Sequence, residues 1–157
     1  MALEIERKFL VHHEGWNQIK NNCKQKLIRQ GYLSTDPEKT IRVRISGNEA
    51  FLTIKGKNEG AVRSEFEYTI PLDDAAQLLN HFCTGELSKT RFLFPHGNHT
   101  WEIDVFSGKN EGLIVAEIEL QSVNESFEKP DWIAAEVTQD KRYFNSNLVK
   151  QPFCEWE

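Results

Sequence analysis

Three charged side chains near the N-terminus, Glu4, Glu6 and Lys8, occupy alternate positions of the stretch from Leu3 to Leu10. In an extended strand, alternate side chains lie on one face about 6.6 Å apart, because each residue rises by about 3.3 Å. Two carboxylates at that spacing repel each other unless a positive group lies between them, and a divalent cation with oxygen ligands fits this role. Lys8 adds a positive charge on the same face. The spacing therefore predicts a surface that binds a metal ion and an anion together.

The same alternation recurs along the chain, and each later segment carries charges of mainly one sign. Basic side chains alternate at Arg42 and Arg44 and at Lys89 and Arg91, with a single basic residue at Lys55; acidic side chains alternate at Glu65 and Glu67, at Glu102 and Asp104, and at Glu117 and Glu119. A solubilising surface would mix the signs, since opposite charges across strands stabilise a sheet and like charges repel. Acidic strands suit cations and basic strands suit a polyanion, so both together suit a metal-bound polyphosphate.

An ordinary antiparallel sheet with one solvated face also alternates charged and apolar residues. Here the apolar positions include Ile41, Val43 and Ile45 on one strand and Ile103 and Val105 on another. Periodicity alone does not say which of the two faces points inward. The residues by themselves therefore leave both a solvated outer face and a charged interior open.

The composition narrows the class of protein. A chain of 157 residues is long enough for one domain with its own core. The net charge of −5 argues against general nucleic-acid binding, which needs a basic footprint. No apolar run approaches 18 residues and no signal-peptide core precedes the first charged strand, so we expect no membrane span and a cytoplasmic location. Cys23, Cys83 and Cys154 are far apart and odd in number, as expected of reduced thiols.

Hydrophobic periodicity and turn residues predict eight strands with helical interruptions. The strands are expected at residues 3–11, 26–33, 40–46, 50–55, 62–70, 87–94, 100–106 and 113–121, and the helices at 14–22, 73–82 and 141–149. Such a run of antiparallel strands has edges to protect, and closure into a barrel removes them. If the charged rows faced inward, the interior would be a hydrated tunnel, because an unpaired buried charge costs several kcal/mol. The outward apolar rows would then need cover from the first two helices and from the regions of Trp16, Trp132 and Trp156.

Taken in order, these motifs resemble the CYTH superfamily, the triphosphate tunnel metalloenzymes. The E-x-E-x-K signature is Glu4, Glu6 and Lys8, and it is followed by Arg29-Gln30-Gly31-Tyr32, Arg42 and Arg44, Lys55, Glu65 and Glu67, Lys89-Thr90-Arg91, Asp104-Val105-Phe106, Glu117 and Glu119, and the ending Glu136-Val137-Thr138-Gln139-Asp140-Lys141-Arg142-Tyr143. The match covers essentially the whole chain. The resemblance implies a single domain over residues 1–157. It also implies an all-β dominated (α+β) fold, an eight-stranded antiparallel barrel around a charged tunnel with a few covering helices.

The resemblance also implies an activity. Members hydrolyse inorganic triphosphate, thiamine triphosphate or RNA 5′-triphosphates, and some are adenylate cyclases. The Arg29-Gln30-Gly31-Tyr32 segment looks most like that of the bacterial inorganic triphosphatases, so the expected reaction is hydrolysis of the terminal phosphoryl group of inorganic triphosphate. The alternatives are a class IV adenylate cyclase, a thiamine triphosphatase and a non-catalytic polyphosphate-binding module. The expected partner is a small-molecule triphosphate, with no nucleic acid and no membrane, and the family suggests a homodimer.

Charge and resemblance together assign roles to the candidate residues. Phosphate oxygens are expected to contact Lys8, Arg42, Arg44, Lys55, Lys89, Arg91, Lys141 and Arg142, and two ions of Mg²⁺ or Mn²⁺ are expected at Glu4, Glu6, Asp104, Glu117 and Glu119. One ion would bridge phosphate oxygens and the other would activate water for in-line attack. Glu65, Glu67 and Glu102 are expected to orient the basic side chains or complete the metal surroundings. Lys8, Tyr32 and Glu119 are the expected catalytic residues.

Overall fold

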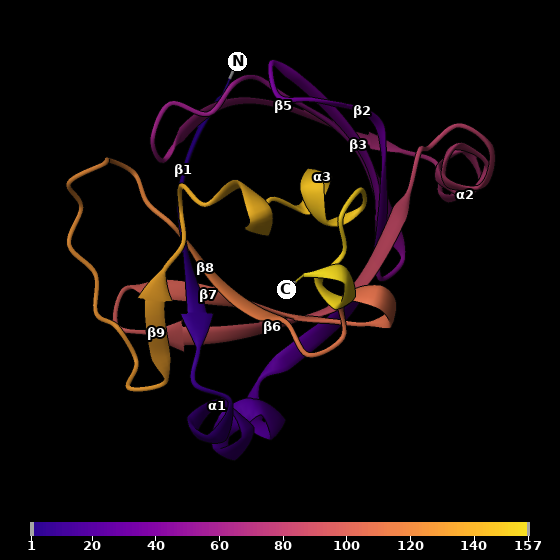
Figure 1. Cartoon of the computed structure of the whole chain (residues 1–157). Coiled ribbons are helices and arrows are strands. Elements are labelled where there is room, and N and C mark those ends of the chain that lie inside the picture. Colours follow the sequence, from indigo (N-terminus) through magenta and orange to yellow (C-terminus); the bar gives the residue numbers. More distant parts are fainter. Residues whose placement is uncertain (1, 157) are drawn as a thin grey trace.

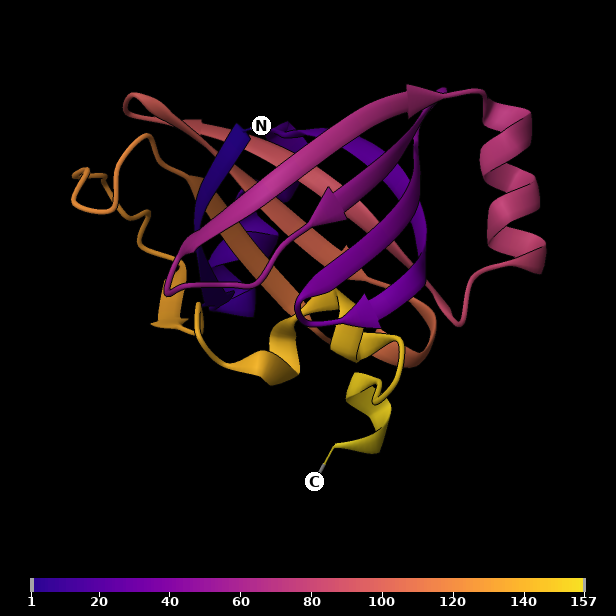
Figure 2. The same cartoon turned by 90° about the horizontal axis from the view of Figure 1, so that it is seen from above.

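The structure is a computed structural model and describes residues 2–156. Its main feature is a closed antiparallel barrel, seen along its axis in Figure 1 and from the side in Figure 2. The barrel strands are β1 (Ala2–Val11), β2 (Lys24–Asp36), β3 (Lys39–Ser46), β4 (Glu49–Lys55), β5 (Val62–Ile70), β6 (Glu86–His96), β7 (His99–Phe106) and β8 (Ile114–Glu119). The predicted eight-stranded barrel is confirmed, with β2 beginning two residues earlier and ending three residues later than expected.

The N-terminal strand closes the barrel because it changes partner along its length. The strands follow the order β5-β4-β3-β2-β6-β7-β8-β1, and β1 returns to β5 through the pairs from Ala2 with Glu65 to Ile5 with Val62. A short ninth strand, β9 (Ile133–Glu136), takes over the same edge of β1 at Phe9. This strand was not predicted from the sequence, because four residues are too few to establish a period of two.

The charged rows of the strands lie on the inner face of the barrel. Register brings Lys8 opposite Glu117 between β1 and β8, and Arg91 opposite Asp104 between β6 and β7. Lys89 is 1% exposed and Asp104 is 0% exposed, although both are charged. A solvated outer face would leave such side chains in water, so the structure answers the question that periodicity left open.

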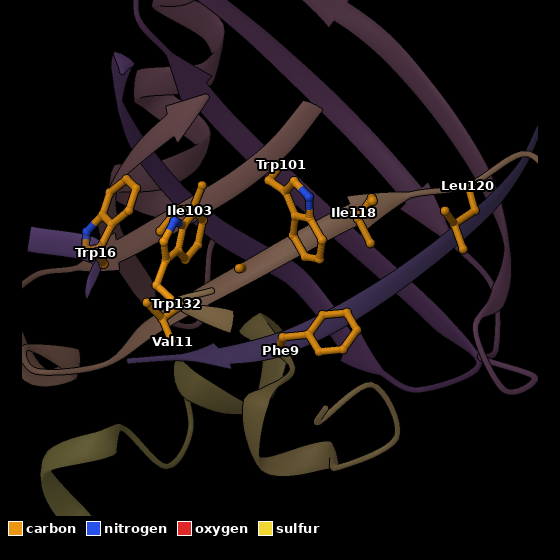
Figure 3. Packing of buried hydrophobic residues seen from close by; sticks show 9 residues of the cluster. Phe9, Val11, Trp16, Trp101, Ile103, Ile118, Leu120 and Trp132 are labelled. Atoms are coloured by element: carbon orange, nitrogen blue, oxygen red, sulfur yellow. The ribbon is translucent and has the colours of Figure 1, made fainter. Parts of the chain in front are cut away.

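The main apolar core lies outside the barrel wall, between the outer face and the segments that cover it. Figure 3 shows Phe9, Trp101 and Ile118 packed together on this face, with Trp16 and Trp132 beside them. Phe9 and Trp101 meet edge to face with ring centres 5.5 Å apart. Trp16 belongs to α1 (His13–Ile19), which continues as the 3₁₀ turn η1 (Lys20–Asn22). Burying a large apolar side chain contributes roughly 1.5–3 kcal/mol, so this cover stabilises the barrel substantially.

Helix α2 (Leu72–His81) covers a second part of the outer face. Pro71 precedes its first turn, which carries two aspartates that favour the positive end of the helix dipole. Ala75 and Leu79 are buried against Val43 and Ala50 of β3 and β4. The predicted helix at 73–82 and its covering role are thus confirmed. No helix in residues 2–156 is both long and apolar enough to cross a membrane.

The C-terminal segment closes one end of the barrel, as Figures 1 and 2 show, and residues 141–149 of it are called the plug below. The predicted continuous helix at 141–149 is wrong, because Phe144 has an extended backbone with ψ of 131° and separates η3 (Lys141–Tyr143) from α3 (Asn145–Leu148). Tyr143 and Leu148 pack with the apolar ends of the inner rows, including Leu87, Phe106, Leu113 and Val115. Two further 3₁₀ turns, η2 (Gly108–Asn110) and η4 (Phe153–Glu155), are joined by a hydrogen bond from the Phe153 N–H to Asn110, and Trp156 packs on Tyr143.

Candidate active site

A polar cavity of about 300 Å³ lies inside the barrel. Nearly every charged residue that the sequence singled out lines it, namely Glu4, Glu6, Lys8, Arg42, Arg44, Lys55, Glu65, Glu67, Lys89, Arg91, Glu102, Glu117 and Glu119, together with Tyr32. The volume suits a small molecule, and acidic and basic side chains line the cavity side by side. Three expected site residues, Asp104, Lys141 and Arg142, are not part of this lining.

Three carboxylates from three strands converge on one point of the cavity. Oxygen atoms of Glu6, Glu102 and Glu117 all lie within 4.8 Å of one another. Burial, together with the charges of Glu117 and Glu4, raises the pKa of Glu6 well above its ordinary value. Carboxylate oxygens are the ligands that Mg²⁺ and other hard cations prefer. The donor set therefore fits a divalent metal ion, which would offset the mutual repulsion of the three groups.

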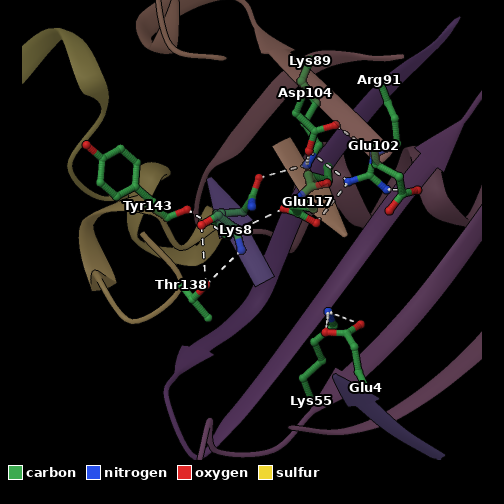
Figure 4. A network of polar contacts seen from close by, with 12 residues as sticks. Glu4, Lys8, Lys55, Lys89, Arg91, Glu102, Asp104, Glu117, Thr138 and Tyr143 are labelled. Carbon is green, nitrogen blue, oxygen red and sulfur yellow. Dashed lines mark hydrogen bonds and ion pairs between the residues drawn. The ribbon is translucent and has the colours of Figure 1, made fainter. Parts of the chain in front are cut away.

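A second acidic group surrounds Lys55. Its ammonium lies 2.9 and 3.0 Å from the two oxygens of Glu4 and 3.4 Å from Glu65, as Figure 4 shows for Glu4. Although burial opposes it, hydrogen bonding to Glu65 and the charge of Lys55 lower the pKa of Glu4 to about 2. The hydrogen bond with Glu4, burial and the charge of Glu4 raise the pKa of Glu65 to about 7. Glu4 is therefore the ionised partner of the pair, while Glu65 holds a proton more readily.

Lys89 and Arg91 share one buried carboxylate in the barrel wall. The Lys89 ammonium lies 2.7 Å from Asp104, and Arg91 donates to both Asp104 oxygens at 2.8 and 2.9 Å (Figure 4). Although burial raises it, the charges of Arg91 and Lys89 hold the pKa of Asp104 well below its ordinary value. Burial lowers the pKa of Lys89 to about 7 against the pull of Asp104. Both oxygens of Asp104 are thus engaged by cations rather than turned toward the carboxylate cluster.

Lys8 connects the carboxylate cluster to the C-terminal plug. Its ammonium donates to the carbonyl oxygen of Tyr143 at 3.2 Å and lies 3.7 Å from Glu117. The Phe144 ring centre is 5.7 Å away. The side chain therefore presents a cation between the metal-type cluster and the closed end of the cavity.

Two arginines of β3 retain donors without anionic partners. Arg44 donates through Nε to Gln30 at 2.9 Å, and no carboxylate lies within 4.0 Å of it in residues 2–156. Arg42 donates to Thr53 and lies 3.8 Å from Glu67, while its buried Nε has no hydrogen-bond partner in the described part of the chain. Buried donors are normally satisfied, so the pair is suited to an anion that supplies acceptor oxygens.

The cavity also contains residues that sequence reasoning missed. Arg63 donates to the carbonyl oxygen of Gly56 at 2.7 Å and to Thr40 at 2.8 Å. It lies two positions before Glu65 on the same strand face, so extending the alternation by one step would have found it. Thr138 and Asn145 come from the C-terminal segment, where no periodicity indicates which side chains face the barrel.

The late basic pair lies away from the cavity. Lys141 and Arg142 are exposed on η3, and Arg142 donates to Asp140 at 2.7 Å. The Arg142 guanidinium also lies over the Trp156 ring, 5.2 Å from its centre. These contacts hold Arg142 outside the cavity, and Lys141 is likewise exposed and outside the lining.

Comparison with known proteins now gives the family. The model of the family described as CYTH domain matches residues 2–151. The chain belongs to the CYTH domain family. A relative named inorganic triphosphatase, from Acetivibrio thermocellus, is 46% identical over 98% of this chain and 97% of its own length. Another of the same name, from Nitrosomonas europaea, is 35% identical over 93% of this chain and 96% of its own length.

A solved structure supports the same comparison. The crystal structure of an inorganic triphosphatase superimposes with a TM-score of 0.66 at 33% identity, covering 95% of each chain. The barrel, its inward charged rows and its family membership thus agree with the sequence-based expectation.

Proposed function

We propose that this chain is a metal-dependent inorganic triphosphatase that removes the terminal phosphoryl group of inorganic triphosphate inside the barrel. The observation that carries the proposal is the joint lining of one cavity by a carboxylate cluster and a set of cations. A metal-bound polyphosphate needs both kinds of group at once. Relatives covering nearly the whole chain carry the name inorganic triphosphatase, which supports this substrate class.

The proposed substrate contacts come from the basic inner rows. Arg42 and Arg44 would hold phosphate oxygens through paired N–H donors, for which a guanidinium is better suited than an ammonium. Lys8, Lys55, Lys89 and Arg91 would surround the remaining oxygens, and Arg63 joins this set as a cation on the same lining. Lys141 and Arg142 are left out of the proposed contacts because they lie outside the lining.

The proposed metal ligands are Glu6, Glu102 and Glu117, with Glu4 and Glu119 beside them on the same lining. Bound there, Mg²⁺ or Mn²⁺ would neutralise phosphate charge and favour deprotonation of a coordinated water, and the number of carboxylates accommodates the two ions expected. Glu102, which was expected only to support the site, is now proposed as a ligand because its oxygen lies within the cluster. Asp104, which was expected to be a ligand, is now proposed to position Lys89 and Arg91.

In the proposed reaction, a water oxygen attacks the terminal phosphorus while the bond to the bridging oxygen breaks, giving orthophosphate and pyrophosphate. Negative charge develops on the leaving oxygen, where preorganised cations stabilise it. Lys8 and Lys89 lie near the plugged end of the cavity, through their contacts with Tyr143 and Asn145.

The lining favours inorganic triphosphate over a nucleotide. Apart from Tyr32 and Phe144, it contains no aromatic side chain in the described residues, and Phe144 already lies beside the Lys8 ammonium. A nucleobase would gain little stacking in such a site. This composition favours the triphosphatase over the adenylate cyclase and thiamine triphosphatase alternatives.

Phosphate release from triphosphate, ATP and thiamine triphosphate, measured in parallel with and without Mg²⁺, tests the proposal. We expect metal-dependent release that is fastest with inorganic triphosphate. If the protein instead converted ATP preferentially to cyclic AMP and pyrophosphate, it would be an adenylate cyclase. Tight triphosphate binding without turnover would leave only the binding-module alternative.

A further inference from the structure

Gln30 is a fully buried polar side chain at the inner face of β2, and the proposed chemistry has so far given it no role. It is 0% exposed and lies between two residues of the proposed site. Its Oε1 accepts a hydrogen bond from Arg44 Nε at 2.9 Å, and its Nε2 donates to the Tyr32 hydroxyl at 3.1 Å. The strand register explains the arrangement, because Gln30 is directly opposite Arg44 and Tyr32 is directly opposite Arg42.

The orientation of the Gln30 amide follows from its partners. The Arg44 Nε–H is only a donor, so it requires the carbonyl oxygen of the amide. The NH₂ group must then point to Tyr32, because rotating the amide would place two donors against each other. A hydroxyl that accepts from an NH₂ group cannot return its own proton to that group. The Tyr32 proton must therefore be donated elsewhere.

No acceptor for that proton lies within hydrogen-bond distance in residues 2–156. Tyr32 is 3% exposed, yet it belongs to the lining of the charged cavity. The direction left for its proton is the cavity, where phosphate oxygens are the expected acceptors.

We infer that Gln30 is a positioning residue that holds the Tyr32 hydroxyl as a hydrogen-bond donor to an oxygen of bound triphosphate. The inference rests on the proposed function and deepens it. The same amide fixes the Arg44 guanidinium, so one side chain sets the orientation of two groups that face the substrate. Gln30 itself touches neither substrate nor metal in this arrangement.

The neighbouring residues show why this segment tolerates little change. An added Cβ at Gly31 would lie 2.7 Å from the carbonyl oxygen of Gly85, closer than real Cβ contacts allow. Arg29 points outward and donates to Glu86 at 2.6 Å. Gly31 thus lets the connection after α2 approach the barrel wall, and the hydrogen bond from Arg29 to Glu86 holds that connection in place. Gln30 and Tyr32, on the other face of the strand, point inward.

The test uses Gln30→Glu, which keeps the size and the acceptor for Arg44 but replaces the donor to Tyr32 with a second acceptor. The Tyr32 proton would turn to this carboxylate and away from the substrate. We expect kcat for triphosphate to fall roughly 10- to 100-fold, the range that a hydrogen bond to a charged group supplies. In a Tyr32→Phe background, the same change should alter kcat by less than about twofold, because residues acting through one contact are not additive. A change in KM through Arg44 would occur in both backgrounds.

Two further variants make the test decisive. Gln25→Glu, on the exposed part of β2, is the matched control and should leave kcat unchanged. Gln30→Met removes the donor without adding an acceptor, so its kcat loss should be smaller than that of Gln30→Glu and should also require Tyr32. It replaces Gln30→Glu if melting curves show that the buried carboxylate prevents folding.

Equal kcat losses from the Gln30 substitution in the presence of Tyr32 and in the Tyr32→Phe background would overturn the inference. If Tyr32→Phe lowers kcat and neither Gln30 variant does, the inference fails while the proposed function stands. An unchanged kcat in Tyr32→Phe would show that the Tyr32 hydroxyl does not contribute to turnover, and the positioning role of Gln30 would then also be wrong. Absence of triphosphate hydrolysis by the unmodified protein overturns the proposed function and the inference with it.

Discussion

The Lys89 ammonium lies 2.7 Å from the Asp104 carboxylate, and both side chains are almost completely shielded from solvent. Arg91 binds the same carboxylate through two hydrogen bonds. Asp104 is the shared carboxylate of two cations, so removing its charge would leave Lys89 and Arg91 in the barrel wall without this partner. Asp104 therefore holds two substrate-facing cations in place.

Asp104→Asn should destabilise the fold and weaken catalysis without changing metal affinity. Removing one partner of a buried pair leaves an uncompensated charge and costs about 3–5 kcal/mol. Urea unfolding of this variant and of Asp131→Asn, an exposed control, measures the loss. The Mg²⁺ concentration for half-maximal activity should stay near that of the unmodified protein. A large shift in that concentration would return Asp104 to the metal ligands.

Glu6→Gln should leave the protein as stable as the unmodified one, or more stable, without metal, and less stable than it with Mg²⁺. Without metal, removing one of three converging carboxylates relieves repulsion, so the melting temperature should be unchanged or higher. With Mg²⁺ at about 100 times its Kd, the unmodified protein gains about 2.7 kcal/mol and the variant gains less. Thermal melts in EDTA and in Mg²⁺, with exposed Glu111→Gln as control, compare the two states. Equal stabilisation by Mg²⁺ would exclude Glu6 as a ligand.

Arg42→Ala should raise KM for triphosphate more than it lowers kcat. Arg42 lines the cavity and would hold phosphate in the ground and transition states alike, and loss of uniform binding raises KM. One charge-assisted hydrogen bond is worth roughly 1.5–3 kcal/mol. Arg142→Ala removes an arginine outside the lining and should leave both constants unchanged. Steady-state kinetics of the two variants measure the difference. An unaltered KM in folded Arg42→Ala would contradict the assignment of Arg42 as a phosphate contact.

Arg63→Ala should weaken substrate binding and loosen the loop that follows β4. The guanidinium joins the carbonyl oxygen of Gly56 to Thr40 and faces the cavity. We expect a higher KM together with faster tryptic cleavage after Lys57, because the loop loses its anchor. Arg142→Ala, which removes an exposed arginine outside the lining, is the control. Cleavage at the same rate in Arg63→Ala and the unmodified protein would argue against the anchoring role.

The sequence by itself determined the eight barrel strands, the family and most of the cavity lining. Alternation of Glu4, Glu6 and Lys8 with apolar residues is a local property of an extended chain, and it survives folding because side chains alternate in every strand. The ordered set of such doublets then identified the family, since each doublet has a fixed place in the chain. Thirteen charged lining residues were found from this pattern and Tyr32 from the resemblance, without any knowledge of which strands are neighbours.

Only the tertiary structure decided what each charged side chain touches. Alternation assigns a residue to a face, but cross-strand register decides that Asp104 meets Lys89 and Arg91 while Glu102 joins Glu6 and Glu117. The plug around Tyr143 and the orientation of the Gln30 amide could not be predicted from the sequence either. Both depend on contacts between segments far apart in the chain, and those contacts arise when the barrel closes and buried donors must find their acceptors.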